Sequence, residues 1–564
     1  MVSPAAFVAN SDVPPHRESK VAAAARWSGR LGWTTVGTLA ILVAIVAVAM
    51  ALRFVGLDWG RPFVYHPDES VLVNPAMTMI RTGSWNPNSF TYPSALIYVE
   101  RFIVGILHFT DPTVSLSTDT SGGFAGLASR SGPNALIEQF PYFFAGRAFV
   151  ATVGALMAVP TYFAARAVSN TVGAVAAAIA IAIAPLAVAN SQYLTTDVPT
   201  AALTVLTLWL SLRGLTGGRR WLLAAGFVAG LAASTKYNGG LVVIVPLVVL
   251  LTSCPPRQLL RRPTLTTAGL IVLASMAGFA LLTPAVVFDL RQVWAGGILY
   301  QLHGYSSHPG SQGTDNFIYY LRVLWGDNAI GLGAGLSILA ALGLLISVLR
   351  HRRADLAILS FVIAYYFVVS LPPVRFDRNL LPLMPFLAVL VGQAVGWLVE
   401  LLATRSRRIT GRLGRLPAIA AGLALIVVAA TPSYSLAVAI GQAHLRTDTR
   451  TLAFDWIEAN IPHGATIARE EFTPQISNSD YRVGDAGYLL ANKPLAWYKS
   501  VGFEYVIASS FQFDRYKGIE PQDSFYRSLL AEPIVMDIRP QPGRPGPRVV
   551  MVRLSAASQS AGAP

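Results

Sequence analysis

Charged residues are scarce in this sequence: Asp, Glu, Lys and Arg together make up only 13% of its 564 residues, whereas hydrophobic residues make up 53%. This composition excludes an ordinary soluble domain, in which about a quarter of the residues are charged. Long apolar runs take the place of charge, and residues 31–52 contain no charged side chain. At a rise of about 1.5 Å per residue, that run crosses a hydrocarbon core of roughly 30 Å. The composition therefore predicts a polytopic α-helical membrane protein.

Cysteine is almost absent, and acidic residues are few. The single Cys254 excludes an intramolecular disulfide, and we expect no redox chemistry. Only 29 Asp and Glu balance 43 Lys and Arg, which gives a net charge of +14. Because the basic excess lies in short loops beside apolar runs, membrane topology and anionic lipids account for it. We therefore expect membrane lipids, and no nucleic acid, as partners.

Eleven apolar runs predict about eleven transmembrane helices. The first follows a basic tail of about 30 residues, which favours an uncleaved anchor over a secretory signal. With the N-terminus inside, nineteen Lys and Arg fall in inner segments and only five in short outer loops, as topology rules require. The runs are residues 31–52, 143–165, 171–190, 198–215, 221–235, 239–252, 265–288, 329–349, 354–371, 379–403 and 416–440.

This topology predicts three parts for a multi-pass protein of the cell (inner) membrane. Residues 1–30 form a cytoplasmic tail, and residues 31–441 form the transmembrane domain, with long outer loops at 57–142 and 289–328. Residues 442–564 form an extracytoplasmic domain. Alternating patterns predict a small soluble α/β fold there. Its expected elements are helices at 448–460 and 524–530 and strands at 465–468, 504–509 and 548–554.

Ionisable residues collect at the outer ends of the predicted spans, on the side of the adjacent carboxylates Asp68 and Glu69. No such residue is predicted near a span midpoint, where a transporter would be expected to place one. A carboxylate can deprotonate a hydroxyl, and nearby cations can stabilise an anionic leaving group. An anionic leaving group at a membrane surface indicates a phosphorylated lipid carrier. The other outer-end residues are Arg147, Asp197, Lys236, Asp289, Arg291, Arg375, Asp377 and Arg378.

Five short motifs carry a resemblance to a known family: Tyr65-His66-Pro67-Asp68-Glu69, Arg147 at the second span, Thr195-Thr196-Asp197-Val198-Pro199, Ser234-Thr235-Lys236-Tyr237-Asn238-Gly239, and Arg375-Phe376-Asp377-Arg378-Asn379-Leu380-Leu381-Pro382. Together they resemble the membrane glycosyltransferases of the GT-C fold. The similar group depends on phospholipid carriers and is related to protein O-mannosyltransferases and lipid A aminoarabinose transferases.

The resemblance implies an inverting hexosyl- or pentosyltransferase of the cell envelope. It would move a sugar from a polyprenyl-phosphate donor to a hydroxyl of a glycan, lipid or protein acceptor. Asp68 takes the position of the general base, Glu69 would orient the acceptor or support the base, and Asp197 matches a second acidic position. No cofactor is required, although a divalent metal held by these three carboxylates stays open. The donor phosphate would be contacted by Arg147, Lys236, Tyr237, Arg375, Arg378, His303 and His308.

Other interpretations remain open at this point. Asp68, Glu69 and Asp197 can simply favour the first turns of helices, and Lys236 and Arg378 can be interface anchors. Ser70 and Val71 follow the acidic pair, where protein mannosyltransferases commonly carry a His at the second position, so a protein acceptor is in doubt. A lipid-linked sugar flippase or transporter is the main alternative function, and a scaffold displaying the C-terminal domain is another.

Overall fold

The computed structural model describes residues 33–116, 139–303, 312–326, 330–410, 415–476 and 480–554. Its internal contacts divide the chain into two compact units, Met1–Ile41 and Leu42–Pro564. The membrane helices from Leu42 onward and the C-terminal sheet belong to the second unit. All contacts and cavities described below lie within it.

Within the described residues, seven helical stretches are long and apolar enough to cross a bilayer, by length and composition. Each lies where an apolar run predicts a span, so the chain is a multi-pass helical membrane protein, as its composition indicates. The stretches are α1 (Trp33–Phe54), α5 (Phe140–Leu156) with α6 (Ala158–Val168), α9 (Asp197–Gly217), α12 (Arg262–Leu282), α18 (Arg353–Ser370), the 3-10 turn η7 (Asp377–Leu383) with α19 (Met384–Thr410), and α20 (Arg415–His444).

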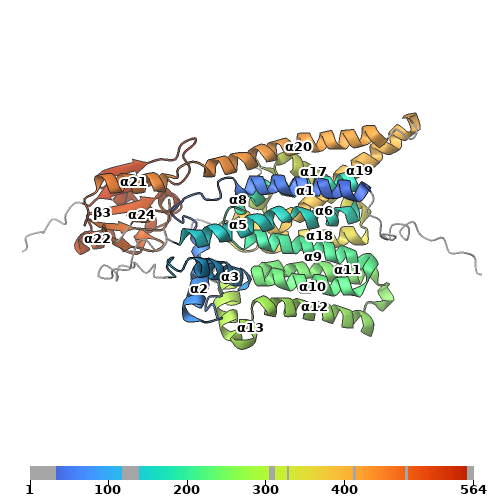
Figure 1. Cartoon of the computed structure of the whole chain (residues 1–564), viewed down its shortest axis with the longest axis horizontal. Helices are drawn as coiled ribbons and strands as arrows, with labels where there is room; N and C mark the ends of the chain where they lie inside the picture. The colour runs from blue at the N-terminus through green and yellow to red at the C-terminus, as the bar shows by residue number, and fades with distance from the viewer. Residues whose placement is uncertain are drawn as a thin grey trace, which may run out of the picture. The chain divides into compact units, whose positions relative to one another are not determined.

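Four further predicted spans form helices that are shorter than the rest. They are α7 (Thr171–Ile183), α10 (Arg219–Thr235), α11 (Ile244–Ser253) and α17 (Ala334–Arg350). Two of these helices are continued by a short element: α8 (Pro185–Asn190) follows α7, and the 3-10 turn η3 (Tyr237–Val243) precedes α11. Figure 1 shows α10 and α11 running beside α9 and α12, within the same helical layer as the longer spans.

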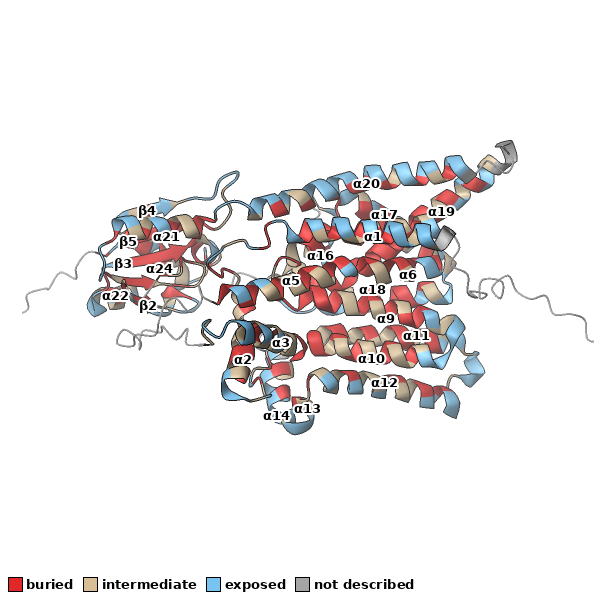
Figure 2. Cartoon of the chain, viewed as in Figure 1, coloured by how far each residue is buried: buried red, intermediate tan, exposed pale blue. Residues whose placement is uncertain are grey.

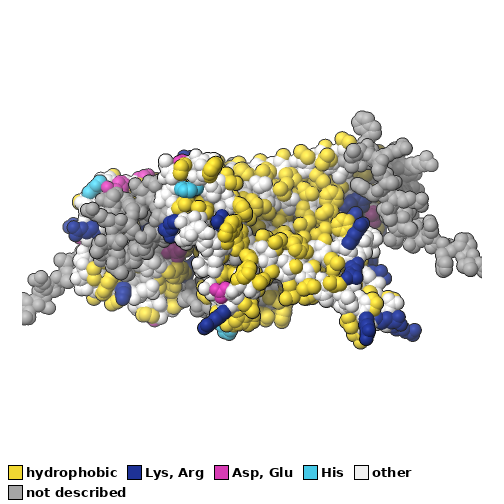
Figure 3. Space-filling view, turned by 60° about the horizontal axis from the view of Figure 1, so that its bottom comes forward, with side chains coloured by type: hydrophobic (Ala, Val, Ile, Leu, Met, Phe, Trp, Pro, Cys, Tyr) yellow, Lys and Arg dark blue, Asp and Glu magenta, His cyan; other side chains and the backbone are white. Residues whose placement is uncertain are grey.

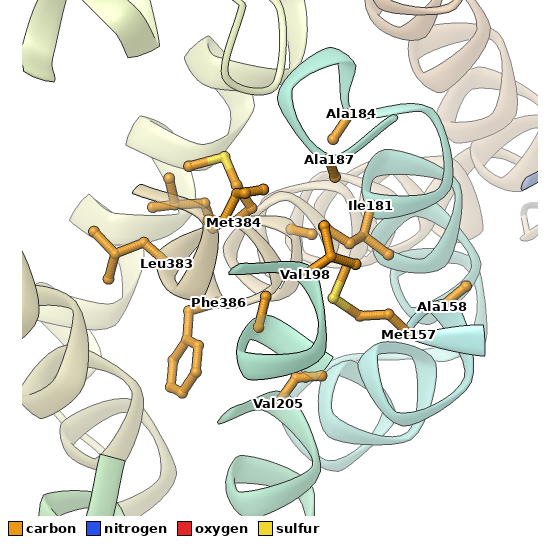
Figure 4. Close-up of a cluster of buried hydrophobic side chains, with 14 of the residues drawn as sticks. Met157, Ala158, Ile181, Ala184, Ala187, Val198, Val205, Leu383, Met384 and Phe386 are labelled. Atoms are coloured by element: carbon orange, nitrogen blue, oxygen red, sulfur yellow. The ribbon is translucent and has the colours of Figure 1, made fainter. Parts of the chain in front are cut away.

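Small residues let the membrane helices approach closely. Gly173 of α7 faces Gly392 of α19, and a Cβ on either glycine would collide with the backbone oxygen of the other. The hydroxyl of Ser169 donates to the carbonyl of Gly392 at 2.9 Å. Such contacts matter because lipid tails compete with any purely hydrophobic attraction between helices. The adjoining core contains the apolar side chains of Met157, Ile181, Val198, Val205, Leu383, Met384 and Phe386 (Figure 4).

The outer faces of the helices are apolar, whereas the turns at one end are basic. Figure 2 shows exposed residues along α12 and α20, and these include Leu273, Met276, Val427 and Val428. Exposed apolar surface of this extent suits contact with lipid. In Figure 3 hydrophobic side chains cover the helices and Lys and Arg gather at one end. The exposed basic turns hold Arg213, Arg219, Arg220, Arg257, Arg261, Arg262, Arg352 and Arg353.

The segments predicted as long outer loops contain helices of their own. The first holds α2 (Pro67–Thr82) and α3 (Ala95–Thr110). The second holds α14 (Leu290–Gln292), the π-helix η5 (Val293–Leu299), α15 (Tyr300–His303) and α16 (Asn316–Trp325). The short helix α13 (Ala285–Phe288) directly precedes this segment. A further 3-10 turn, η4 (Pro256–Gln258), lies at the basic end of the bundle.

The C-terminal region forms a five-stranded mixed sheet in the order β2-β1-β3-β5-β4. Its strands are β1 (Thr466–Arg469), β2 (Arg482–Asp485), β3 (Tyr505–Ser509), β4 (Ile534–Ile538) and β5 (Val549–Arg553). β1 runs parallel to β2 and β3, whereas β5 is antiparallel to β3 and β4. The predicted strands at 465–468, 504–509 and 548–554 correspond to β1, β3 and β5. The expected α/β fold of the C-terminal region is confirmed.

Helices cover both faces of this sheet. α21 (Thr449–Asn460) packs Ala453 and Ile457 against one face, which includes Ile467 and Ile507. α22 (Leu495–Val501) and α24 (Gln522–Leu530) pack on the other face around Val506. Two short elements complete the domain, η9 (Leu490–Asn492) and α23 (Ser510–Phe513). The sequence prediction missed β2 and β4 because β2 is four residues with a Gly and two charges, and β4 is a short edge strand.

Candidate active site

A cavity of about 920 Å3 lies where the first outer segment, the turn before α19 and the C-terminal sheet meet. Asp68, in the first turn of α2, lines it from one side, and Arg378, in η7, lines it from another. The C-terminal domain contributes Glu471 and Arg515. The acidic motif after the first span and the arginine motif before α19 are thus brought into one site.

Asp68 is an ionised carboxylate on the cavity wall. Arg378 Nη1 donates to its Oδ2, and 24% of the Asp68 side chain remains exposed. Burial alone would raise the pKa of Asp68, but the charge and hydrogen bond of Arg378 and the nearby Lys236 hold it below its ordinary value. Asp68 also lies at the helix start, where negative charge is favourable, so the helix-start interpretation and the site interpretation apply together.

Glu69 is fully buried in a two-pronged ion pair with Arg147. Arg147 Nε and Nη2 donate to the two carboxylate oxygens, each at 2.7 Å, and both side chains have 0% exposure. The backbone N–H of Leu194 donates to the same carboxylate at 3.0 Å. Arg147 Nη1 also donates to the carbonyls of Leu57 and Trp59. Neither Glu69 nor Arg147 lines the cavity. We expected both beside the substrate, but the structure places them beneath the wall, where they hold it together.

Glu100, on α3, is a second buried carboxyl close to this pair. Burial raises the pKa of Glu100 well above its ordinary value, and the charge of Glu69 raises it further. Neither of its carboxyl oxygens has a hydrogen-bond partner among the described residues. Burial and the charge of Glu69 therefore both favour the neutral form of Glu100.

Asp197 and Lys236 form another nearly buried ion pair. Lys236 Nζ donates to Asp197 Oδ1 at 2.6 Å, and the two side chains are 16% and 3% exposed respectively. Asp197 lies in the first turn of α9, but the hydrogen bond of its side chain is with Lys236 rather than with the helix backbone. Neither residue lines the cavity, although the charge of Lys236 reaches Asp68. This pair supports the wall next to the acidic motif.

The other predicted phosphate contacts lie outside the cavity lining. The hydroxyl of Tyr237 donates to the carbonyl of Phe90 at 2.9 Å. Arg375 pairs with Asp315 at 2.5 Å. His303 lies exposed at the end of α15, and His308 lies outside the described residues. Of the seven predicted phosphate contacts, only Arg378 is placed on the cavity wall in the described part of the chain.

A chain of hydrogen bonds fixes η7, which carries Arg378, against η3. Asn238 Nδ2 donates to the hydroxyl of Tyr365, and that hydroxyl donates to the carbonyl of Asn379. Asn379 Nδ2 in turn donates to the hydroxyl of Tyr320 at 3.1 Å. Both 3-10 turns follow an extended residue and lead into a membrane helix. Hydrogen bonds therefore connect the motif around Lys236 to the motif around Arg378.

The C-terminal domain is tied directly to the first outer segment. Arg450, held by two bonds to Asp448, lies with its guanidinium 4.0 Å from the ring centre of Tyr65 and donates to the Tyr65 carbonyl. Gln475 Nε2 donates to the carbonyl of Val64, and Val64 N–H donates back to Gln475 Oε1. These bonds place the loop after β1 against the residues that precede Asp68.

Two neighbouring glutamates in that loop have raised pKa values for different reasons. Glu470 is fully buried, and burial raises its pKa to about 8, although Leu490 N–H and the hydroxyl of Tyr526 donate to it. Glu471 lines the cavity, and burial raises its pKa to about 7, with the charge of Asp68 adding to the effect. Near neutral pH, Glu471 can therefore donate or accept a proton beside Asp68, whose pKa is lowered.

These two pKa values predict a pH-dependent stability of the C-terminal domain. Both are raised above the unfolded value of about 4.3, so the stabilisation is complete below that pH and is lost as the pH rises through 7 and 8. We expect the melting temperature of the wild-type protein to fall between pH 6 and pH 9. Glu471→Gln should reduce that fall by about 1.4 kcal/mol in unfolding free energy. Glu520→Gln, at an exposed carboxylate, is the control, and a Glu471→Gln curve parallel to the wild-type curve would contradict the assignment.

The predicted carboxylates do not come together as a metal site. Glu69 is bound by Arg147 and Asp197 by Lys236, which leaves Asp68 as the only one of the three on the cavity wall. In the described ranges, no group of three or more His, Cys, Asp or Glu side chains is placed to hold a metal ion. The residues of this site do not fit the divalent metal that the sequence left open.

Several cavity residues have no sequence signal that singles them out. Glu471 and Arg515 come from loops of the C-terminal domain, which sequence analysis assigned only as a soluble α/β fold. Arg446 and His444 lie at the end of α20. Thr449-Arg450-Thr451, at the start of the helix predicted at 448–460, contacts Tyr65 through Arg450 and Thr451.

Known proteins are similar to this chain in part of the sequence and in fold. Residues 136–281 match the sequence profile of the dolichyl-phosphate-mannose-protein mannosyltransferase family. No curated protein sequence matches the chain. Among solved structures, ArnT from Cupriavidus metallidurans in the apo state is 16% identical, with a TM-score of 0.53, over 90% of this chain and 97% of ArnT.

Two more solved structures extend the comparison. ArnT from the same organism bound to undecaprenyl phosphate has a TM-score of 0.51 at 16% identity, over 90% of this chain and 97% of that one. The archaeal oligosaccharyltransferase AglB from Archaeoglobus fulgidus, in complex with an inhibitory peptide and a dolichol-phosphate, has a TM-score of 0.52 at 14% identity, over 86% of this chain and 71% of that one. The chain therefore has the GT-C fold of ArnT and AglB and, over residues 136–281, the sequence pattern of the dolichyl-phosphate-mannose-protein mannosyltransferases.

Proposed function

We propose that the protein is an inverting glycosyltransferase that moves a sugar from a polyprenyl-phosphate donor to an acceptor hydroxyl at the extracytoplasmic surface. The observation that carries this proposal is the pairing of Asp68 with Arg378 on the wall of one cavity. A base for the acceptor and a cation for the leaving phosphate are thus adjacent. The family match over residues 136–281 and the fold shared with ArnT and AglB support the same reaction class.

The reaction needs one bond to form as another breaks. Asp68 takes the proton of the acceptor hydroxyl, whose oxygen attacks the anomeric carbon from the face opposite the phosphate. The bond between that carbon and the phosphate oxygen breaks, and polyprenyl phosphate leaves with the electron pair. Arg378 stabilises the leaving phosphate, because a guanidinium suits a phosphate as well as a carboxylate.

In the proposed reaction Arg378 pairs first with Asp68 and then, once the donor is bound, with the donor phosphate. Without donor, Arg378 is bound to Asp68 and lowers its pKa. A donor phosphate competes for the same guanidinium, and its arrival weakens that hold on the carboxylate. The pKa of Asp68 then rises, and the carboxylate becomes a stronger base only when the donor is in place. This exchange would limit proton abstraction in the absence of donor.

The remaining ion pairs act as positioning groups in this proposal. Glu69 and Arg147 hold the start of α2 to α5, and so fix the direction of Asp68. Asp197 and Lys236 keep a positive charge close to Asp68 without entering the cavity. These roles replace the direct phosphate contact expected of Arg147.

We also propose eleven spans, with the cavity on the extracytoplasmic side. α9 begins at Asp197 and ends beside Arg219, so its basic turn and the site lie at opposite ends of one helix. The basic turns would face the cytoplasm, as short loops rich in Arg do. The C-terminal domain and the cavity would then face outward, where sugars linked to lipid phosphates replace nucleotide sugars as donors.

The proposed reaction can be tested with purified protein and a panel of radiolabelled polyprenyl-phosphate sugars that carry hexoses or pentoses. We expect one donor to be cleaved to polyprenyl phosphate by the wild-type protein when an extract of envelope glycans and lipids is supplied. A flippase would instead move the intact lipid across proteoliposomes without cleaving it. Movement of a donor without bond breakage would overturn the proposal.

Arg378→Ala should weaken donor use by about 10- to 100-fold in KM, because it removes a charged hydrogen bond of roughly 1.5–3 kcal/mol. Arg378→Lys should lose less, since it keeps the charge but not the fork geometry. Arg375→Ala is the matched control, three residues away, because Arg375 pairs with Asp315 outside the cavity lining. Equal KM values for Arg378→Ala and the wild type would remove Arg378 from the donor site.

A further inference from the structure

Building on the proposed function, we infer that the loops at the carboxyl ends of β1, β2 and β3, which line the cavity, hold a saccharide acceptor. The subsite is formed by Glu471, Phe472, Tyr488, Phe511 and Arg515. The proposal assigns the acceptor to carbohydrate chemistry, and assigns its binding to the soluble domain rather than to the membrane helices.

Sheet topology brings these five side chains together. Glu471 and Phe472 follow β1, Tyr488 follows β2, and Phe511 and Arg515 follow β3. Because β1 is parallel to both β2 and β3, the carboxyl ends of all three strands lie side by side at the same end of the sheet. β1 lies between the other two, and ligands of open α/β sheets bind outside the carboxyl ends of such strands.

The subsite presents aromatic rings to the cavity. Phe511 is 45% exposed and Tyr488 is 39% exposed, so both rings are open to the cavity that they line. Phe472 packs edge-on against Phe511, with ring centres 5.5 Å apart. Phe472 also has a φ of +63°, a left-handed conformation that a bulky residue adopts only where its surroundings enforce it. The fold therefore accepts backbone strain to present this ring.

Charged groups border the rings. Arg515 donates to the hydroxyl of Tyr488, and its guanidinium lies 5.9 Å from the ring centre of Phe472. Glu471 lies close enough to Arg515 and Asp68 for both charges to act on its carboxyl. A sugar ring has an apolar C–H face and a rim of hydroxyls, so it matches a wall of aromatic faces bordered by a carboxyl and a guanidinium. A lipid tail would leave those charged groups without partners.

A second cavity adjoins this wall and provides space for an acceptor longer than one sugar ring. Its volume is about 610 Å3, and it shares Glu471, Phe472 and Tyr488 with the first cavity. It runs between the first outer segment and the loops after β1 and β2, along Asn74 and Asp485. An acceptor of more than one sugar ring can thus place its reacting hydroxyl at Asp68 and extend past Glu471 into this space.

The test uses the full-length protein with Asp68→Asn, so that no turnover occurs, in lipid nanodiscs. Saturation-transfer NMR is recorded with mannobiose, maltose, galactobiose, arabinofuranobiose and a threonine-containing hexapeptide. We expect transfer to the ring protons of a disaccharide, and we expect it to persist after decaprenyl-phosphate mannose is added, because the donor occupies a different part of the cavity. Phe511→Ala should reduce disaccharide affinity about tenfold, as loss of an aromatic contact does. Arg515→Ala should reduce it similarly.

Two matched variants serve as controls. Ile534 is 44% exposed, like Phe511, but lies on the edge strand β4 and outside the cavity lining. Arg527 is an exposed cation that is also outside the cavity lining. Ile534→Ala and Arg527→Ala should leave disaccharide binding unchanged. The inference is overturned if no disaccharide shows saturation transfer or if only the peptide binds. It is also overturned if adding Phe511→Ala leaves the disaccharide affinity unchanged. Donor cleavage by the wild-type protein is measured separately, so failure of the proposed reaction and failure of this subsite are distinguishable.

Discussion

Replacing Asp68 by Asn is expected to abolish sugar transfer while the protein still folds and binds donor. The change keeps the shape of the side chain but removes the base, and loss of general-base catalysis costs about 10²- to 10⁴-fold in rate. The carboxylate is 24% exposed and sits at the surface of a cavity, so its neutral amide analogue is tolerated there. The measurement is the rate at which polyprenyl phosphate is released from a labelled donor.

The control for Asp68→Asn is the same substitution at Asp111, which is exposed on the first outer segment and lies outside the cavity lining. Asp111→Asn should transfer sugar at the wild-type rate. Donor affinity should rise or stay equal in Asp68→Asn, because Arg378 no longer has a competing carboxylate. Turnover by Asp68→Asn within threefold of wild type would exclude Asp68 as the base.

Breaking the buried pair of Glu69 and Arg147 is expected to destabilise the protein strongly. Arg147→Met leaves the charge of Glu69 without its cation, and Glu69→Gln leaves the guanidinium without its carboxylate. Removing one partner of a buried pair costs about 3–5 kcal/mol. The neighbouring carboxyl of Glu100 cannot replace the missing cation in Arg147→Met, because a carboxyl group carries no positive charge. Heating followed by size-exclusion chromatography in detergent measures the loss as a lower temperature of half-unfolding.

Glu520→Gln is the matched control for this second prediction. It breaks an ion pair with Arg527 in which both partners are more than half exposed, and such pairs contribute only about 0–1 kcal/mol. Its half-unfolding temperature should match that of the wild type. If Arg147→Met is as stable as Glu520→Gln and instead loses donor affinity, Arg147 contacts phosphate after all, and its assignment as a structural group is wrong.

Apolar runs predicted the seven described stretches that are long enough to cross a bilayer, because such helices are recognised by the length and composition of the run. The shorter helices α7 and α11 show what composition leaves out: a break at Pro185 and a 3-10 turn at Tyr237–Val243 divide runs that look continuous in sequence. The strands β1, β3 and β5 were predicted because each is an apolar run between turn residues. Edge strand β2 lacks that pattern, since its pairing comes from β1.

The candidate site was predicted at the level of motifs but not of single side chains. Asp68 and Glu69 are neighbours in sequence, yet successive helical residues point about 100° apart. One therefore faces the cavity, and the other is buried against Arg147. Glu470 and Glu471 differ in the same way, because successive residues of an extended chain point to opposite sides. A motif shows that a carboxylate pair is present, but only packing decides which member meets the substrate.

The division of the cavity wall has a consequence for how such a protein can diversify. Asp68 and Arg378 come from the membrane part of the chain, whereas the ring-bearing loops come from the C-terminal sheet, which is fastened through Arg450 and Gln475. In the proposed function, reaction and selectivity are thus encoded in separate stretches of the sequence. Exchanging residues 449–554 between homologues, with those two fastenings retained, would re-target the chemistry without rebuilding it.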